Sequence, residues 1–312
     1  MPNLRHPLIL PALVVLSSAA LCLAPSGARA VTAGFAFLEV PAGARASALG
    51  GAYGTLADGV DAAFWNVAGL AGVQGLQVMG SHYEFFESLR HDQVAVAGRL
   101  FGGGLAASVR ALYSEPIEER DESGNLIGTF GAHDLEFGLA YGRSLGGGLR
   151  VGGSAQLFRE RVANLAASTY GFGGGASWEP PPLPRMRLGV SLHNWGADAE
   201  YLIDGVPGAP VPLPTAVQTG VSYGLDLGGQ LGARAALETR LTRGRNAVGM
   251  LGAELSHPLG AAVRLGMRAN DDASSLSVGA GYALSALRID YAFVPYRLDL
   301  GDTHRLSFAA QF

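Results

Sequence analysis

The chain has 312 residues, of which 48% are hydrophobic and only 15% charged, and 46 of them are glycine. This composition is typical of a membrane protein or of a Gly/Ala-rich repeat. The formal net charge is −4 with histidine neutral, and the chain has 22 arginines and no lysine. Because the positive charge is not clustered, the sequence excludes a nucleic-acid partner.

The first 30 residues have the organisation of a cleaved signal peptide. Arg5 precedes an apolar run from Leu8 to Leu23, and Ala28 and Ala30 supply the small residues of a cleavage site after Ala30. A retained anchor is disfavoured because the run is shorter than the roughly 20 residues of a helical span. The sequence therefore predicts export from the cytoplasm.

Residues 31–74 do not follow a strand pattern. They are rich in Gly and Ala, and a short helix is expected over residues 62–70, preceded by Asp58 and Asp61. Aspartate commonly caps the first turn of a helix. Capping is thus one role for these two carboxylates.

Residues 75–312 divide into segments of alternating side chains separated by turn residues, as the strands of a membrane barrel do. The pattern predicts an all-β fold, a transmembrane antiparallel up-and-down β-barrel of about 14 strands. The fourteen segments are 76–83, 93–100, 105–113, 135–141, 149–158, 170–178, 186–193, 216–225, 231–241, 247–255, 261–268, 276–284, 287–294 and 305–312.

Connection lengths alternate as they do in outer-membrane barrels, where periplasmic turns are short and extracellular loops longer. If the first strand runs outward, the six periplasmic turns are all short. The longer connections lie on the extracellular side, at residues 84–92, 114–134, 159–169, 194–215 and 295–304. Only 242–246 and 269–275 are brief on that side.

Charged side chains fall on one face of the predicted strands. A lipid-facing arginine near the membrane midplane costs about 2–4 kcal/mol, so these residues are expected to face the lumen. They are Arg110, Glu136, Arg150, Arg187, Arg234, Glu238, Arg264, Arg268, Arg288, Asp290 and Arg305. A network that neutralises itself and fills the lumen is favoured over a substrate path.

The last seven residues alternate and end on an aromatic residue. Leu306, Phe308 and Phe312 share one face of the last segment, as in the closing strand of an outer-membrane barrel. These residues form the expected C-terminal signal, with outer-membrane lipid and the barrel assembly machinery as expected partners.

Enzyme motifs are weak in this chain. Residues 171–176 match a dinucleotide fingerprint, but no helix follows them. Ser191 and His193 share a strand face, as the serine and histidine of a lipase must meet, but a lipase function has little support. No catalytic residue, metal site or cofactor is predicted.

The segment before the barrel carries a recognisable signature. Gly43-Ala44-Arg45-Ala46, Leu49-Gly50-Gly51-Ala52-Tyr53, Ala57-Asp58 and Trp65-Asn66 resemble the amino-terminal signature of the PorV/PorQ family of outer-membrane barrels, which are similar to FadL-type fatty-acid transporters. That family usually has proline where this chain has Val67. The resemblance implies a 14-stranded barrel whose amino-terminal segment forms a periplasmic hatch.

The resemblance also suggests which residues hold the hatch. Arg45, Asp58, Asp61, Trp65 and Asn66 belong to it, and their charged and amide groups can bond wall charges. Small residues let the segment fit a narrow lumen. Capping of the short helix stays an equally good account of the two aspartates.

Two non-enzymatic functions follow from the resemblance. The favoured one is protein export or surface attachment, of the type IX secretion kind, or a related cell-envelope role with secreted proteins as cargo. The alternative is FadL-like passive transport of fatty acids or other hydrophobic small molecules. An apolar pocket beneath the loops would favour transport, whereas a polar, plugged lumen would favour the export role.

Overall fold

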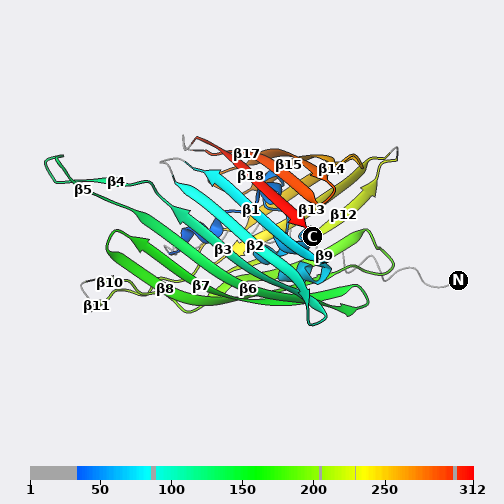
Figure 1. Cartoon of the computed structure of the whole chain (residues 1–312), viewed down its shortest axis with the longest axis horizontal. Helices are drawn as coiled ribbons and strands as arrows, with labels where there is room; N and C mark the ends of the chain where they lie inside the picture. The colour runs from blue at the N-terminus through cyan, green and yellow to red at the C-terminus, as the bar shows by residue number, and fades with distance from the viewer. Residues whose placement is uncertain (1–33, 86–88, 204–205, 229, 298–300) are drawn as a thin grey trace.

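Fourteen antiparallel strands close into one barrel in the computed structural model, which describes residues 34–85, 89–203, 206–228, 230–297 and 301–312 (Figure 1). The strands of the barrel wall are β1 (Leu76–Glu84), β2 (Arg90–Leu100), β3 (Gly103–Tyr113), β6 (Ala132–Gly146), β7 (Leu149–Val162), β8 (Leu165–Trp178), β9 (Met186–Gly196), β12 (Ala216–Asp226), β13 (Gly232–Thr242), β14 (Val248–Ser256), β15 (Ala261–Ala269), β16 (Leu276–Leu284), β17 (Leu287–Pro295) and β18 (Asp302–Gln311). The predicted fold class is confirmed. The predicted signal peptide lies outside the described residues.

The barrel closes by pairing its first strand with its last. β1 and β18 are antiparallel from Gln77 opposite Gln311 to Tyr83 opposite Arg305. Beyond the strands, the backbone N–H of Phe312 donates to the carbonyl of Leu76 at 2.8 Å. We call this end of the barrel the closing rim, and the opposite end, which carries the longest connections, the loop rim.

The outward face of the wall is apolar. On β15, Val263, Leu265 and Met267 are about half exposed, whereas Arg264 between them is buried on the inside. The same alternation repeats around the barrel, because successive side chains of a strand point to opposite faces. An outward belt of leucine, valine and aromatic residues suits contact with lipid.

The connections at the loop rim differ in part from the expected irregular loops. Residues 114–131 contain a hairpin of β4 (Ile117–Arg120) and β5 (Leu126–Phe130), and residues 197–215 contain β10 (Leu202–Ile203) and β11 (Val206–Pro207). The expected loop at 159–169 is wrong, because Val162 pairs with Leu165 and both strands run on to a tight turn. Strands β6, β7 and β8 are therefore longer than the other strands of the wall (Figure 1).

Residues 34–75, which precede β1, lie inside the ring of strands (Figure 1). They form η1 (Ala36–Glu39), α2 (Ala44–Ala48), η2 (Gly59–Phe64) and η3 (Val67–Gly72). The single helix expected over residues 62–70 is wrong, because the chain turns at Trp65 and Asn66 and Asn66 starts a new helix. We call residues 34–75 the inner segment.

The inner segment supplies most of the buried apolar side chains. Leu49, Tyr53, Trp65 and Leu70 belong to one core cluster, together with Met79 and alanines of the wall. None of the helices in the described part of the chain is long and apolar enough to cross a membrane. The core therefore lies inside the barrel.

Replacing Leu265, at the middle of β15, with arginine should destabilise the folded barrel by about 2–4 kcal/mol, because its side chain faces lipid at the membrane midplane. Leu259→Arg, in the exposed turn between β14 and β15, should cost at most about 1 kcal/mol. Urea titrations in lipid vesicles, followed by tryptophan fluorescence, give both values. Equal costs would contradict the assigned lipid face.

Candidate functional site

A chain of alternating charges joins the inner segment to the wall. Glu254 binds Arg45 at 2.7 Å and Arg264 at 2.6 Å. Asp290 then lies between Arg264, at 2.9 Å, and Arg288, at 2.8 Å. The series begins on the inner segment at Arg45 and crosses β14, β15 and β17.

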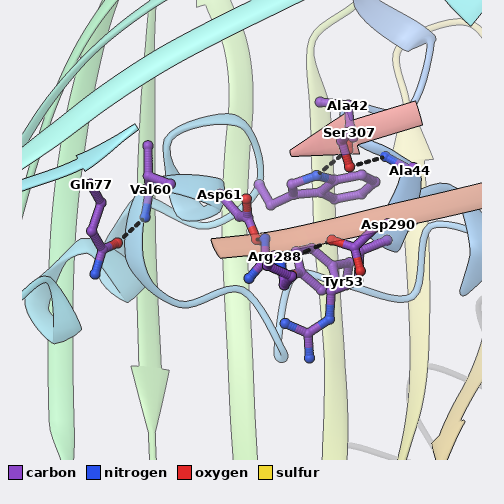
Figure 2. A network of polar contacts seen from close by, with 12 residues as sticks. Ala42, Ala44, Tyr53, Val60, Asp61, Gln77, Arg288, Asp290 and Ser307 are labelled. Carbon is purple, nitrogen blue, oxygen red and sulfur yellow. Dashed lines mark hydrogen bonds and ion pairs between the residues drawn. The ribbon is translucent and has the colours of Figure 1, made fainter. Parts of the chain in front are cut away.

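The same series of ion pairs ends on the inner segment, at Asp61. Arg288 contacts this carboxylate at 2.5 Å, and the Tyr53 hydroxyl donates to it at 3.0 Å (Figure 2). Removing one member would leave a buried charge without a partner, which typically destabilises a folded protein by about 3–5 kcal/mol. Both ends of the network are therefore tied to residues that the resemblance assigns to the hatch.

Asp58 forms a second anchor at the closing rim. Its two carboxylate oxygens contact Arg150 and Arg187, each at 2.9 Å. Glu179 contacts the same two guanidinium groups. Asp58 occupies the N-cap position of η2 but accepts no capping hydrogen bond there, so ion pairing replaces the expected capping role.

Glu238 binds the backbone of the inner segment directly. This buried carboxylate on β13 accepts hydrogen bonds from the N–H groups of Gly54, at 3.0 Å, and Thr55, at 2.8 Å. The Thr55 hydroxyl and the Gln218 amide also donate to it, at 2.6 and 2.5 Å. Charge-assisted hydrogen bonds of this kind are stronger than neutral ones, so this turn of the chain is held firmly.

Two further wall arginines complete the contact. Arg305 donates to the Ser47 hydroxyl at 2.8 Å and lies 4.7 Å from the centre of the Tyr83 ring. Arg110 pairs with Glu136 at 3.1 Å and lies over the Phe64 ring. Each cation is satisfied partly by the wall and partly by the inner segment.

Trp65 and Asn66 fix the turn between η2 and η3. The Trp65 indole N–H donates to the Ala42 carbonyl at 3.0 Å. The Asn66 side chain accepts from Ala68 at 3.2 Å and donates to the Ala176 carbonyl of β8, also at 3.2 Å. Asn66 therefore caps a helix and contacts the wall at once.

Three predicted groups lie outside this network. Arg234 is exposed on β13 near the closing rim, and Arg268 pairs at 3.0 Å with Asp271 of the loop rim. Leu306, Phe308 and Phe312 are exposed on the outward side of the closing strand. Whether these three form an assembly signal stays a prediction.

Inward glycines of the wall make room for the inner segment, a feature that the sequence analysis missed. A Cβ atom added at these positions would overlap the inner segment at closer than van der Waals distance. They are Gly104, Gly142 and Gly152 against η3, Gly175 against Asn66, Gly252 and Gly266 against Leu49 and Gly50, and Gly279 against Ala48. Strand parity was the available signal for the glycines of β3, β6, β7, β14 and β15, which share a strand face with a wall charge, whereas β8 and β16 carry no charged residue.

A cavity of about 520 Å³ lies between the inner segment and the loop rim. Gly51, Trp65, Gln218 and Met250 form its floor, and its sides carry Arg240 and other residues of the wall. Its upper lining comes from residues 242–248 and 268–273, around the two connections expected to be brief. The sequence analysis missed Arg240, although it stands two residues from Glu238 on the same strand face.

A second cluster at the loop rim is apolar around one carboxylate. Phe35, Phe37, Phe158 and Leu213 pack together. Glu160 accepts hydrogen bonds from the Phe35 N–H, at 2.7 Å, and from the Tyr201 hydroxyl. Burial and the Glu160 carboxylate both raise the pKa of Tyr201, so this phenol stays protonated and joins the loop to the inner segment.

An apolar groove of about 470 Å³ lies on the outward face over β6, β7 and β8. Phe137, Leu157 and Phe172 line it, and inward-facing glycines lie at its base.

Ser191 and His193 are hydrogen bonded at 2.8 Å on the inner face. In the described part of the chain, no three metal-ligating side chains gather.

A family model with the description "Uncharacterised protein family (UPF0164)" matches residues 14–168. That match spans just under half of the chain. No curated protein matches this sequence. The resemblance to the PorV/PorQ family stays a prediction.

Solved structures of similar fold cover most of the chain. The toluene transporter TbuX of Ralstonia pickettii has a TM-score of 0.58 at 14% identity, over 86% of this chain and 98% of that one. The CymD monoaromatic hydrocarbon channel has 0.57 at 15%, over 86% and 97%. A Pseudomonas aeruginosa FadL homologue has 0.51 at 13%, over 88% and 99%. At these identities the likeness shows a shared FadL-type barrel fold.

Gly142→Ala should destabilise the seated inner segment by about 1–3 kcal/mol, because the added methyl group would meet the η3 backbone. The measurement is protease cleavage within residues 34–75 of the intact barrel, together with its urea midpoint. Gly153→Ala, on the neighbouring strand with its nearest neighbour at 3.9 Å, is the control. Similar behaviour of the two variants would contradict the proposed seat.

Proposed function

We propose that this protein is a passive, FadL-like channel of the outer membrane that takes up a small organic molecule from outside the cell. The observation that carries the proposal is the cavity of about 520 Å³ that opens toward the loop rim above the inner segment. Small-molecule sites are typically clefts of about 300–1,000 Å³. The cavity has the size of a ligand site and is far too small for a folded protein.

The comparisons favour uptake over the export role preferred from sequence. TbuX is a toluene transporter and CymD a monoaromatic hydrocarbon channel, and both have this barrel fold over almost their whole length. Ion pairs hold the inner segment at the closing rim, where Asp58 contacts Arg150, and at the loop rim, where Glu39 contacts Arg245. A lumen filled in this way suits a small molecule better than a polypeptide.

The apolar groove on β6, β7 and β8 supports an exit through the wall. Its base is Gly138, Gln156 and Gly171, so few side-chain atoms separate it from the lumen there. Gln156 also lines a small internal pocket next to Trp65 and Asn194. An exit at this point would require the paired backbone of β6, β7 and β8 to open, because Gln156 pairs with Gly138 and with Gly171.

Uptake of labelled toluene by a Gram-negative host without its own FadL-type channels tests the proposal. Cells that express this protein should take up toluene faster than the empty host. Val248→Trp should lower uptake severalfold, because Val248 lines the cavity and the larger ring narrows it. Leu251→Trp adds the same ring on the lipid face of the same strand and should leave uptake unchanged.

The export reading makes the opposite prediction. If uptake equals that of the empty host, and secreted proteins copurify in stoichiometric amounts with the barrel extracted from its own membrane, the channel proposal fails. Equal uptake by the two tryptophan variants would also contradict it.

A further inference from the structure

We propose that the cavity at the loop rim selects an amphipathic carboxylate whose apolar part is about the size of one aromatic ring. This inference rests on the proposed function, because it names the ligand class of the same cavity. The groups that carry it are Arg240, Arg268 and the apolar patch around Trp65.

Of the three described arginines that line the cavity, Arg240 is the one that lacks a close counterion. The other arginines of the cavity have one, since Arg245 contacts Glu39 at 2.9 Å and Arg268 contacts Asp271 at 3.0 Å. Among the described residues, no carboxylate lies within ion-pair distance of Arg240. A half-buried guanidinium without such a partner is costly unless an anion reaches it.

Arg268 adds a second positive charge to the lining of the same cavity. Its Nε atom is buried and has no hydrogen-bond partner among the described residues. Arg268 lies on β15, opposite Met250, and Arg240 lies on β13, opposite Val248. Two strand spacings of about 4.8 Å separate these strands, so Arg268 adds its positive charge to that of Arg240 across the cavity.

The floor of the cavity supplies an apolar surface of limited size. Trp65, Val248 and Met250 line one part of it. Polar and charged side chains surround that part, among them Gln218, Asn270 and the carboxylates Glu39, Asp271 and Asp272. A long alkyl chain would extend past this apolar part and remove water from the charged side chains around it, which is unfavourable. One ring beside a carboxylate matches both parts.

Calorimetric titration of the purified mature barrel with benzoate and with benzamide tests the inference. The two probes share a ring and differ in charge. Because hydrogen bonds to charged groups are the stronger class, benzoate should bind at least about tenfold more tightly. Arg240→Gln should remove that preference.

The matched control is Arg234→Gln, which removes the same charge from the same strand near the other rim. It should keep the preference for benzoate, and unchanged heat-modified gel mobility shows that both variants are folded. Equal affinity for the two probes, or full benzoate binding by Arg240→Gln, would overturn the inference. Inorganic phosphate that binds as tightly as benzoate would overturn its apolar part.

Toluene uptake separates the two proposals. If wild-type cells take up toluene and benzoate shows no preference, only the carboxylate inference fails. If toluene uptake equals that of the empty host, the channel proposal fails, whatever the titration gives.

Discussion

The inward charges of the wall are the constraint on which the rest of the structure depends. Lipid requires the outward side chains to be apolar, so the charged residues of the strands point into a narrow lumen, where each needs a partner. Other wall charges supply some of these partners, as Glu136 does for Arg110, and the inner segment supplies others. Arg45 forms an ion pair with Glu254, and Asp61 forms one with Arg288. The wall and the segment inside it therefore stabilise one another.

The shape of the free space in the lumen follows from the contact between the wall and the inner segment. Helices of four to six residues pack against strands only because the facing wall positions are glycine, as at Gly142 beneath Val67 and Gly266 beneath Gly50. The inner segment fills the lumen on the side of the closing rim and leaves space above Trp65. The cavity is thus the part of the lumen that the inner segment does not fill.

Sequence reasoning predicted the barrel because a strand period of two is legible in each segment, as on β15 from Val263 to Met267. It also named both members of the Asp61–Arg288 contact. It could not pair them, because residues 227 positions apart meet only through barrel closure. Arg240 was missed for a related reason, since the lack of a close counterion is a property of the folded lumen and leaves no local pattern.

Hydrogen exchange of the inner segment in the intact barrel tests the central claim most directly. The account predicts that amides of residues 44–72, including Gly54 and Thr55 bound to Glu238, exchange as slowly as those of the strands. Exchange as fast as in the hairpin of β4 and β5 would contradict it, because the segment would then not be held by the wall charges.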